Sequence, residues 1–134
     1  MIKQDYLLRL IQEVMRAISM ILHGKKNEEE KQKELDKCYQ TFLGKDKTFF
    51  LSKNLEELTH TFSEEPEANQ MMKLEALATI MEGDAQLTTN SEEQYKLTIK
   101  ALYLLEYVSQ WERTYSIERE LKIMKLKRLC AIEE

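Results

Sequence analysis

Glycine and proline are scarce in this chain, which has three glycines and one proline among 134 residues. Leucine, lysine, glutamate, methionine, alanine and glutamine dominate instead. This composition favours helix over sheet, because these residues tolerate the helical backbone that glycine and proline break.

Histidine and cysteine are also rare, with two residues of each. Cys38 and Cys130 show no CxxC or Cys/His spacing, and no local motif joins a nucleophile to a base. We therefore expect two reduced, buried thiols, and neither a catalytic residue nor a cofactor or metal ion.

Long apolar runs are missing from the N-terminal segment. Asp5, Arg9, Glu13 and Arg16 interrupt it, which argues against a secretory signal, and the uncharged run 17–22 is far shorter than the roughly 20 residues that span a bilayer. A net charge of −4 argues against general affinity for nucleic acid. We expect a cytoplasmic protein with no membrane partner.

Apolar residues are nevertheless abundant, at 43% of the chain. This fraction and the length suit one hydrophobic core, so residues 1–134 are expected to form one all-helical domain.

The stretch 95–111 is the most continuously apolar helical segment. At about 100° per residue, one side and the arc beside it collect Leu97, Ala101, Leu104, Val108 and Trp111, then Tyr95, Ile99, Leu102 and Leu105. Such a wide apolar arc needs neighbours on at least two sides. We predict that it is the central helix of the protein.

The remaining chain divides into further helices. Apolar spacing and capping signals predict them near 3–23, 28–43, 66–87, 91–113 and 117–131, with a short one after Ser52 or Asn54. Residues 45–51 are expected to be a connector that is not a strand and whose Phe49 and Phe50 plug one end of the core. The result is five or six helices arranged as stacked antiparallel hairpins. The last helix, about 116–132, is expected to pack on the domain end or on a second subunit, unless 91–131 is one long helix.

The segments 71–87 and 91–108 resemble one tetratricopeptide-type hairpin. A helix rich in small residues and a short polar turn lead into Ser91 to Tyr95 and then Lys100 to Leu102. The whole chain is similar to an uncharacterised bacterial family of tetratricopeptide-like helical proteins, a domain of unknown function, through this hairpin and three short segments, Gln4 to Tyr6, Leu43 with Gly44, and Thr114 to Arg119. The resemblance implies a helical fold and supplies no site residues.

Two carboxylate patterns raise the question of a metal site. Glu57 and His60 have the spacing used in di-iron bundles, but no second copy exists because Met20 stands three residues before His23. The acidic run 28–30 with Glu34 and Asp36 could hold Mg²⁺, yet the lysines that alternate with it favour a solvated helix face. A metal-dependent hydrolase whose site is completed across a dimer is therefore an alternative hypothesis.

The C-terminal segment is basic, with Arg119, Lys122, Lys125, Lys127 and Arg128. These cations alternate with Leu, Ile and Met, which favours a packing helix with a basic rim over a nucleic-acid surface. Binding of nucleic acid through this helix is the third hypothesis.

One face of the segment 95–111 carries a mixed strip that we call the α-helical strip, formed by Lys96, Lys100, Tyr103, Tyr107 and Trp111. Aromatic residues beside a polar face favour protein contacts. The strip either binds a partner or meets the last helix of the same chain. We predict a small non-enzymatic interaction or scaffold module, whose partner is an unknown protein or a second copy in a homodimer.

Overall fold

The computed structural model describes the backbone of residues 2–111 and 116–133, and the side chains of residues 9–111 and 116–131. These ranges contain no strand and form seven helices: α1 (Ile2–Leu22), α2 (Glu28–Leu43), α3 (Lys47–Leu51), α4 (Leu55–Thr59), α5 (Glu67–Leu87), α6 (Ser91–Trp111) and α7 (Ile117–Glu133). The predicted all-α class is confirmed. Of the short segments named above, the side chains of residues 4–6 and all of residues 114–115 lie outside the described parts.

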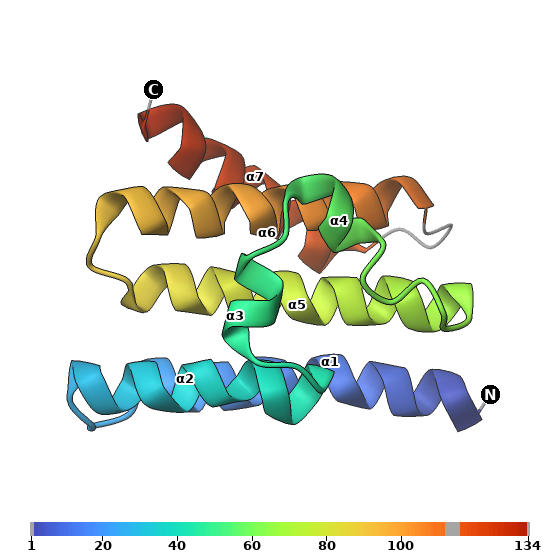
Figure 1. The fold of residues 1–134 in the computed structure, drawn as a ribbon, viewed down its shortest axis with the longest axis horizontal. Helices are drawn as coiled ribbons and strands as arrows, with labels where there is room; N and C mark the ends of the chain where they lie inside the picture. Colours follow the sequence, from blue (N-terminus) through green and yellow to red (C-terminus); the bar gives the residue numbers. More distant parts are fainter. Residues whose placement is uncertain (1, 112–115, 134) are drawn as a thin grey trace.

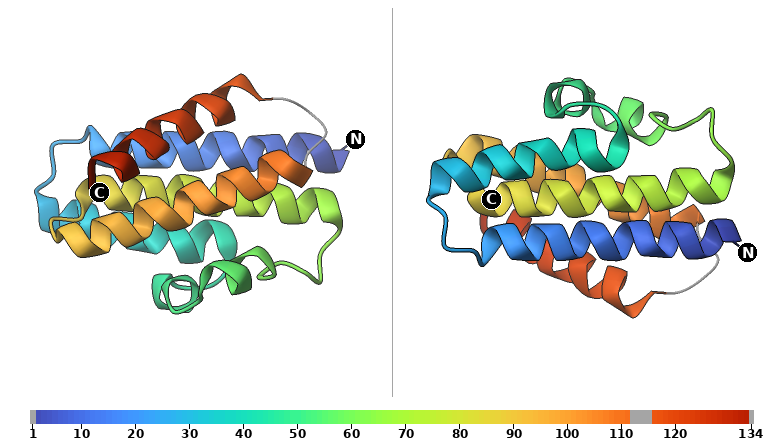
Figure 2. Two further views of the ribbon diagram at one scale, coloured as in Figure 1. Left: turned by 90° about the horizontal axis from the view of Figure 1, so that it is seen from above. Right: turned by 90° about the horizontal axis from the view of Figure 1, so that it is seen from below.

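The long helices form two antiparallel pairs that lie on one another (Figure 1). α1 pairs with α2, α5 pairs with α6, and α5 contacts both helices of the first pair. α7 folds back along α6 and crosses it at an angle, as Figure 2 shows from above. Residues 91–111 and 117–133 are therefore two helices. A tetratricopeptide repeat geometry for these pairs stays a prediction.

The central helix is α5, and the prediction that 95–111 holds this place is wrong. α5 has twelve buried residues spread around its circumference, whereas α6 has six. The reason is the small side chains of α5, such as Ala76, Ala78 and Ala85, which let α1, α2 and α6 approach from different directions. α6 buries Leu97, Leu105 and Val108 as expected, half-buries Leu102, and leaves one side open.

Gly83 marks the closest of these approaches. A Cβ atom there would lie 2.7 Å from Cγ2 of Ile18 on α1 and 3.4 Å from Cδ1 of Leu35 on α2. α5 continues past it to Leu87. The glycine therefore permits tight packing and does not end the helix.

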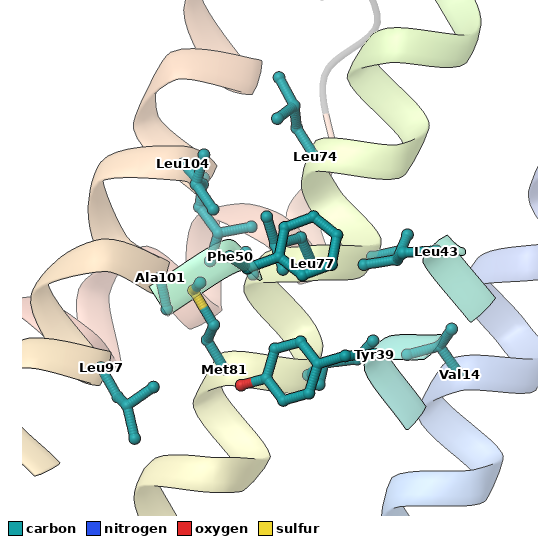
Figure 3. Packing of buried hydrophobic residues seen from close by; sticks show 14 of the residues in the cluster. Val14, Tyr39, Leu43, Phe50, Leu74, Leu77, Met81, Leu97, Ala101 and Leu104 are labelled. Carbon is teal, nitrogen blue, oxygen red and sulfur yellow. The ribbon is translucent and has the colours of Figure 1, made fainter. Parts of the chain in front are cut away.

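The core lies between the two helix pairs and is closed on one flank by α3 (Figure 3). Phe50 of α3 is fully buried, with its ring centroid 6.0 Å from that of Tyr39 and 6.2 Å from that of Phe62. Residues 47–51 form no strand, as predicted, but they are helical and cover a side of the core, so the expected plug at one end of the core is corrected. The reason is that Asp46 caps a new helix soon after α2 ends, so that α3 packs beside α2 and places Phe50 against Tyr39.

Helix ends follow the capping signals closely. Asn27 Oδ1 accepts a hydrogen bond from the Glu30 backbone N–H at 2.9 Å, and Gly44 ends α2 at φ 83°. Asn54 and Glu57 form a reciprocal capping box at α4. Within the described ranges, no helix has the length and apolarity needed to cross a membrane.

Candidate functional site

A carboxylate in the middle of the protein, Asp84 of α5, organises a buried polar cluster. Asp84 has no exposed surface, and a buried charge is costly unless it is paired and hydrogen-bonded. Tyr39 of α2 donates its hydroxyl to Oδ2 at 2.8 Å, and Gln32 Nε2 donates to Oδ1 at 2.8 Å. Lys47 Nζ lies 3.1 Å from Oδ2. Three helices therefore meet at one side chain.

The cluster extends from Asp84 toward the surface through Asp36. Lys47 Nζ lies 3.0 Å from Asp36 Oδ1, and Gln32 Nε2 also donates to this oxygen at 2.9 Å. Thr88 donates its hydroxyl to the Asp84 backbone carbonyl at 2.7 Å. We call Gln32, Asp36, Tyr39, Lys47 and Asp84 the Asp84 cluster.

Two members of the cluster, Lys47 and Tyr39, have a raised pKa. Burial lowers the pKa of Lys47, but the charges of Asp84 and Asp36 outweigh burial, so its pKa is raised above the ordinary 10.5. Burial and then Asp84 hold the pKa of Tyr39 well above 10.0. Both groups therefore remain hydrogen-bond donors to Asp84 at neutral pH.

A cavity of about 310 Å³ adjoins the cluster at Lys47. It lies between α3, the end of α5 and the first half of α6, and it is lined by Lys47, Leu51, Thr88, Glu93, Lys96, Leu97 and Lys100. We call it the lysine pocket. Lys100 Nζ donates to the Leu51 carbonyl at 2.8 Å, and burial, followed by the charge of Lys96, lowers the pKa of Lys100.

The structure divides the predicted α-helical strip into two parts. Lys96 and Lys100 line the lysine pocket, whereas the aromatic part lies further along α6. Tyr103 is 38% exposed and Trp111 is 56% exposed, while the half-buried Tyr107 ring lies 6.0 Å from the Trp111 ring. α7 contacts α6 on another side, through Ser109 with Glu120 and Glu106 with Lys127.

α7 presents a face with both polar and apolar side chains to the protein. The Arg119 side chain is 3% exposed and lies 3.0 Å from Glu75 Oε1 of α5, and its Nε donates to Ser109 at 2.9 Å. Lys122 lies 3.4 Å from the Thr79 hydroxyl. Apolar burial on this face comes from Ile123 and Leu126.

The outer face of α7 is apolar and uncovered. Three large side chains are exposed there, with exposed fractions of 65%, 59% and 52% for Ile117, Leu121 and Met124. Leu129 is also 44% exposed but lines a pocket beside α5 and α6. The helical spacing puts Ile117, Leu121 and Met124 on one side of this segment and Ile123, Leu126 and Cys130 on another, but it does not indicate which side faces outward.

The carboxylate patterns have local structural roles. Glu57 accepts the Asn54 backbone N–H in the capping box, and His60 is exposed at the end of α4. Asp36 belongs to the Asp84 cluster, and Glu34 pairs with Lys26. The described residues include no group of three or more His, Cys, Asp or Glu side chains placed to hold a metal ion.

Burial of the two cysteines differs. Cys38 is buried, which, with nearby Glu34 and Asp36, raises its thiol pKa to about 11, whereas Cys130 is half-buried. Neither forms a disulfide. The expected burial is therefore confirmed for Cys38 and wrong for Cys130, because α7 contributes only a narrow buried face.

The described residues form an all-α fold with a buried charge cluster at Asp84, a lysine-lined pocket and an uncovered apolar face on α7. No protein-family model, no curated protein and no solved structure matches the chain.

Proposed function

We propose that this protein is a small non-enzymatic interaction module that forms a homodimer through the outer face of α7. The observation that carries the proposal is the outer side of α7, which leaves Ile117, Leu121 and Met124 exposed although the inner side already buries Ile123 and Leu126. Covering the side chains of Ile117, Leu121 and Met124 contributes about 1 kcal/mol each, since each is already partly covered. A monomer does not gain this stabilisation, because these side chains stay exposed to water.

The spacing on the outer face is that of a helix pairing with another helix. Ile117, Leu121, Met124 and Arg128 follow one another at intervals of four, three and four residues, and all are exposed. This alternation forms the seam of antiparallel or parallel helix pairs, where the aliphatic stem of an arginine can also pack.

Charges beside the seam favour a second copy of the same helix. On one flank Glu118 precedes Lys125 by seven residues, and on the other Glu120 precedes Lys127 by seven. An antiparallel pair about a two-fold axis places Leu121 on Met124 of the second copy. The same register sets Glu118 beside Lys125 of the second copy, since the Lys125 side chain is 58% exposed although it lies 3.8 Å from Glu82 of α5. Glu120 and Lys127 instead contact Ser109 and Glu106 of α6 in their own chain. Such a self-complementary surface is what a two-fold dimer requires.

The aromatic part of the α-helical strip is the rival interface. Tyr103 and Trp111 are exposed and offer the rigid contact area that protein partners use. Paired variants of the two surfaces separate these assignments.

The test is sedimentation equilibrium with the full chain. We expect a dimer for the wild type and a monomer for Leu121→Asp with Met124→Asp, because two charges enter the seam. Met20→Asp is the matched control, since Met20 is 70% exposed on α1 and away from the seam. Circular dichroism checks that each variant keeps its helix content.

The charge register provides the sharper test. Glu118→Lys should weaken the dimer and Glu118→Lys with Lys125→Glu should restore it. A wild type that stays monomeric at its highest soluble concentration contradicts the proposal. If Tyr103→Asp with Trp111→Asp dissociates the dimer and the α7 variants do not, the interface is the aromatic part of the α-helical strip.

A further inference from the structure

The lysine pocket brings together three lysine ammonium groups, whose charges are balanced to different degrees by nearby acidic side chains. Lys47 is paired with Asp36 and Asp84 at 3.0 and 3.1 Å, so its charge is balanced inside the Asp84 cluster. Lys96 lies 3.4 Å from Glu92, and because both side chains are mostly exposed this pair is weak. Lys100 is the amine of the pocket whose charge is least balanced.

Lys100 is held at the pocket by a neutral group. Its Nζ donates one hydrogen bond to the Leu51 carbonyl at 2.8 Å, and no ion pair joins it to an acidic side chain of the described residues. An ammonium has three N–H donors, so two of them remain for another acceptor. Burial and the charge of Lys96 both lower the pKa of Lys100. An anion bound between Lys96 and Lys100 would offset the repulsion between the two ammonium groups and stabilise the charged form of Lys100.

The far end of the pocket has the opposite character. Glu93 lies on the same face of α6, seven residues before Lys100, which is about 10 Å along the helix. Its carboxylate can accept a hydrogen bond from a hydroxyl or amino group. Leu51 and Leu97 form apolar walls between the two ends.

From this arrangement we propose that the lysine pocket binds a small molecule with a phosphate or carboxylate group at one end and a hydroxyl or amino group at the other. Lys96 and Lys100 hold the anionic group, and Glu93 holds the donor. The cavity volume of about 310 Å³ lies at the lower end of the roughly 300–1,000 Å³ found for small-molecule sites. The pocket is separate from the α7 seam, since no residue of α7 lines it.

The test is a titration of the full chain followed by amide chemical shifts in NMR. The probes are inorganic phosphate, acetate and phosphoethanolamine, each added at constant ionic strength set with sodium chloride. We expect saturable shifts at Thr88, Leu97 and Lys100 with phosphate or acetate, and whichever binds more tightly identifies the anionic group. Phosphoethanolamine should bind more tightly than phosphate because it also reaches Glu93.

Variants assign the contacts. Lys100→Gln keeps a donor for the Leu51 carbonyl and should weaken phosphate binding about tenfold or more, as loss of a charge-assisted hydrogen bond does. Lys33→Gln, which removes the same charge from the exposed face of α2, should bind like the wild type. Glu93→Gln should weaken phosphoethanolamine but not phosphate.

Two results would overturn the proposal. One is that the amide shifts are equal in wild type and Lys100→Gln and do not saturate, since such shifts reflect a general effect of salt and not binding at the pocket. The other is phosphoethanolamine that binds no more tightly than phosphate, which removes the role of Glu93. Thermal melts of each variant confirm that a lost titration does not come from unfolding.

Discussion

At the scale of single residues, Asp84 shows how a charge is accommodated inside a small helical protein. It lies among apolar neighbours on the most buried helix, and the side chains of Tyr39, Gln32 and Lys47 satisfy its two oxygens. Replacing such a cluster with apolar groups can be neutral, whereas removing one partner leaves the others uncompensated. Asp84 is therefore more sensitive to substitution than its exposed counterparts.

Asp84→Asn should lower the free energy of unfolding by about 3 kcal/mol, because Lys47 loses its buried charge partner and only one acceptor oxygen remains for the two donors Tyr39 and Gln32. Urea unfolding followed by circular dichroism measures this change. Asp36→Asn is the control, since Asp36 is 39% exposed and should cost under about 1 kcal/mol. Equal losses for the two variants would show that burial does not control the cluster.

At the scale of elements, α5 has its central place because of small residues as much as large ones. Gly83 lies where α1 and α2 both approach, and no other residue fits without a shift of Ile18. A glycine inside a helix costs about 1 kcal/mol relative to alanine. Here the close packing of three helices offsets that cost.

Gly83→Ala should therefore destabilise the protein, by about 1–2 kcal/mol, although alanine is the better helix former. The added methyl group would meet Cγ2 of Ile18 at 2.7 Å, and this atom is fixed to a stiff, branched side chain. A double-mutant cycle with Ile18→Ala measures the clash. The two losses should be less than additive, and full additivity would place the strain elsewhere.

Local signals in the sequence predicted the helices but not their arrangement. The boundaries follow caps such as Asn27 and Gly44, which act within four residues. Large apolar side chains in 95–111 led to the prediction that this segment is the central helix. The position of α5 at the centre depends instead on small residues, which make its apolar pattern in the sequence weaker. No local spacing could find the Asp84 cluster, because Tyr39 and Lys47 lie 45 and 37 residues from Asp84.

At the scale of the whole molecule, several groups have a raised pKa near one region of α2 and α3. The pKa of Cys38 rises from 9.0 to about 11, and those of Tyr39 and Lys47 rise above 10.0 and 10.5. Each group binds its proton more tightly in the folded state. The stability that this contributes is complete below the unfolded pKa and is lost as pH rises through the folded pKa.

The free energy of unfolding should therefore be level near pH 8 and should fall from about pH 9 upward, where Cys38 of the unfolded chain begins to ionise. Urea unfolding at successive pH values measures the slope. Cys38→Ala should make the fall between pH 9 and 11 shallower, by up to about 2 kcal/mol. A stability that rises over this range would contradict the assignment of these groups.

The place of α5 along the chain also sets the order in which the protein can assemble during translation. A ribosome adds roughly 5–20 residues per second, so the 44 residues between Leu43 and Leu87 take roughly 2–9 s to make. During this interval the α1–α2 hairpin has been synthesised while the helix that covers Leu35 and Tyr39 has not. The nascent hairpin is therefore a natural substrate for chaperones that recognise exposed apolar surface.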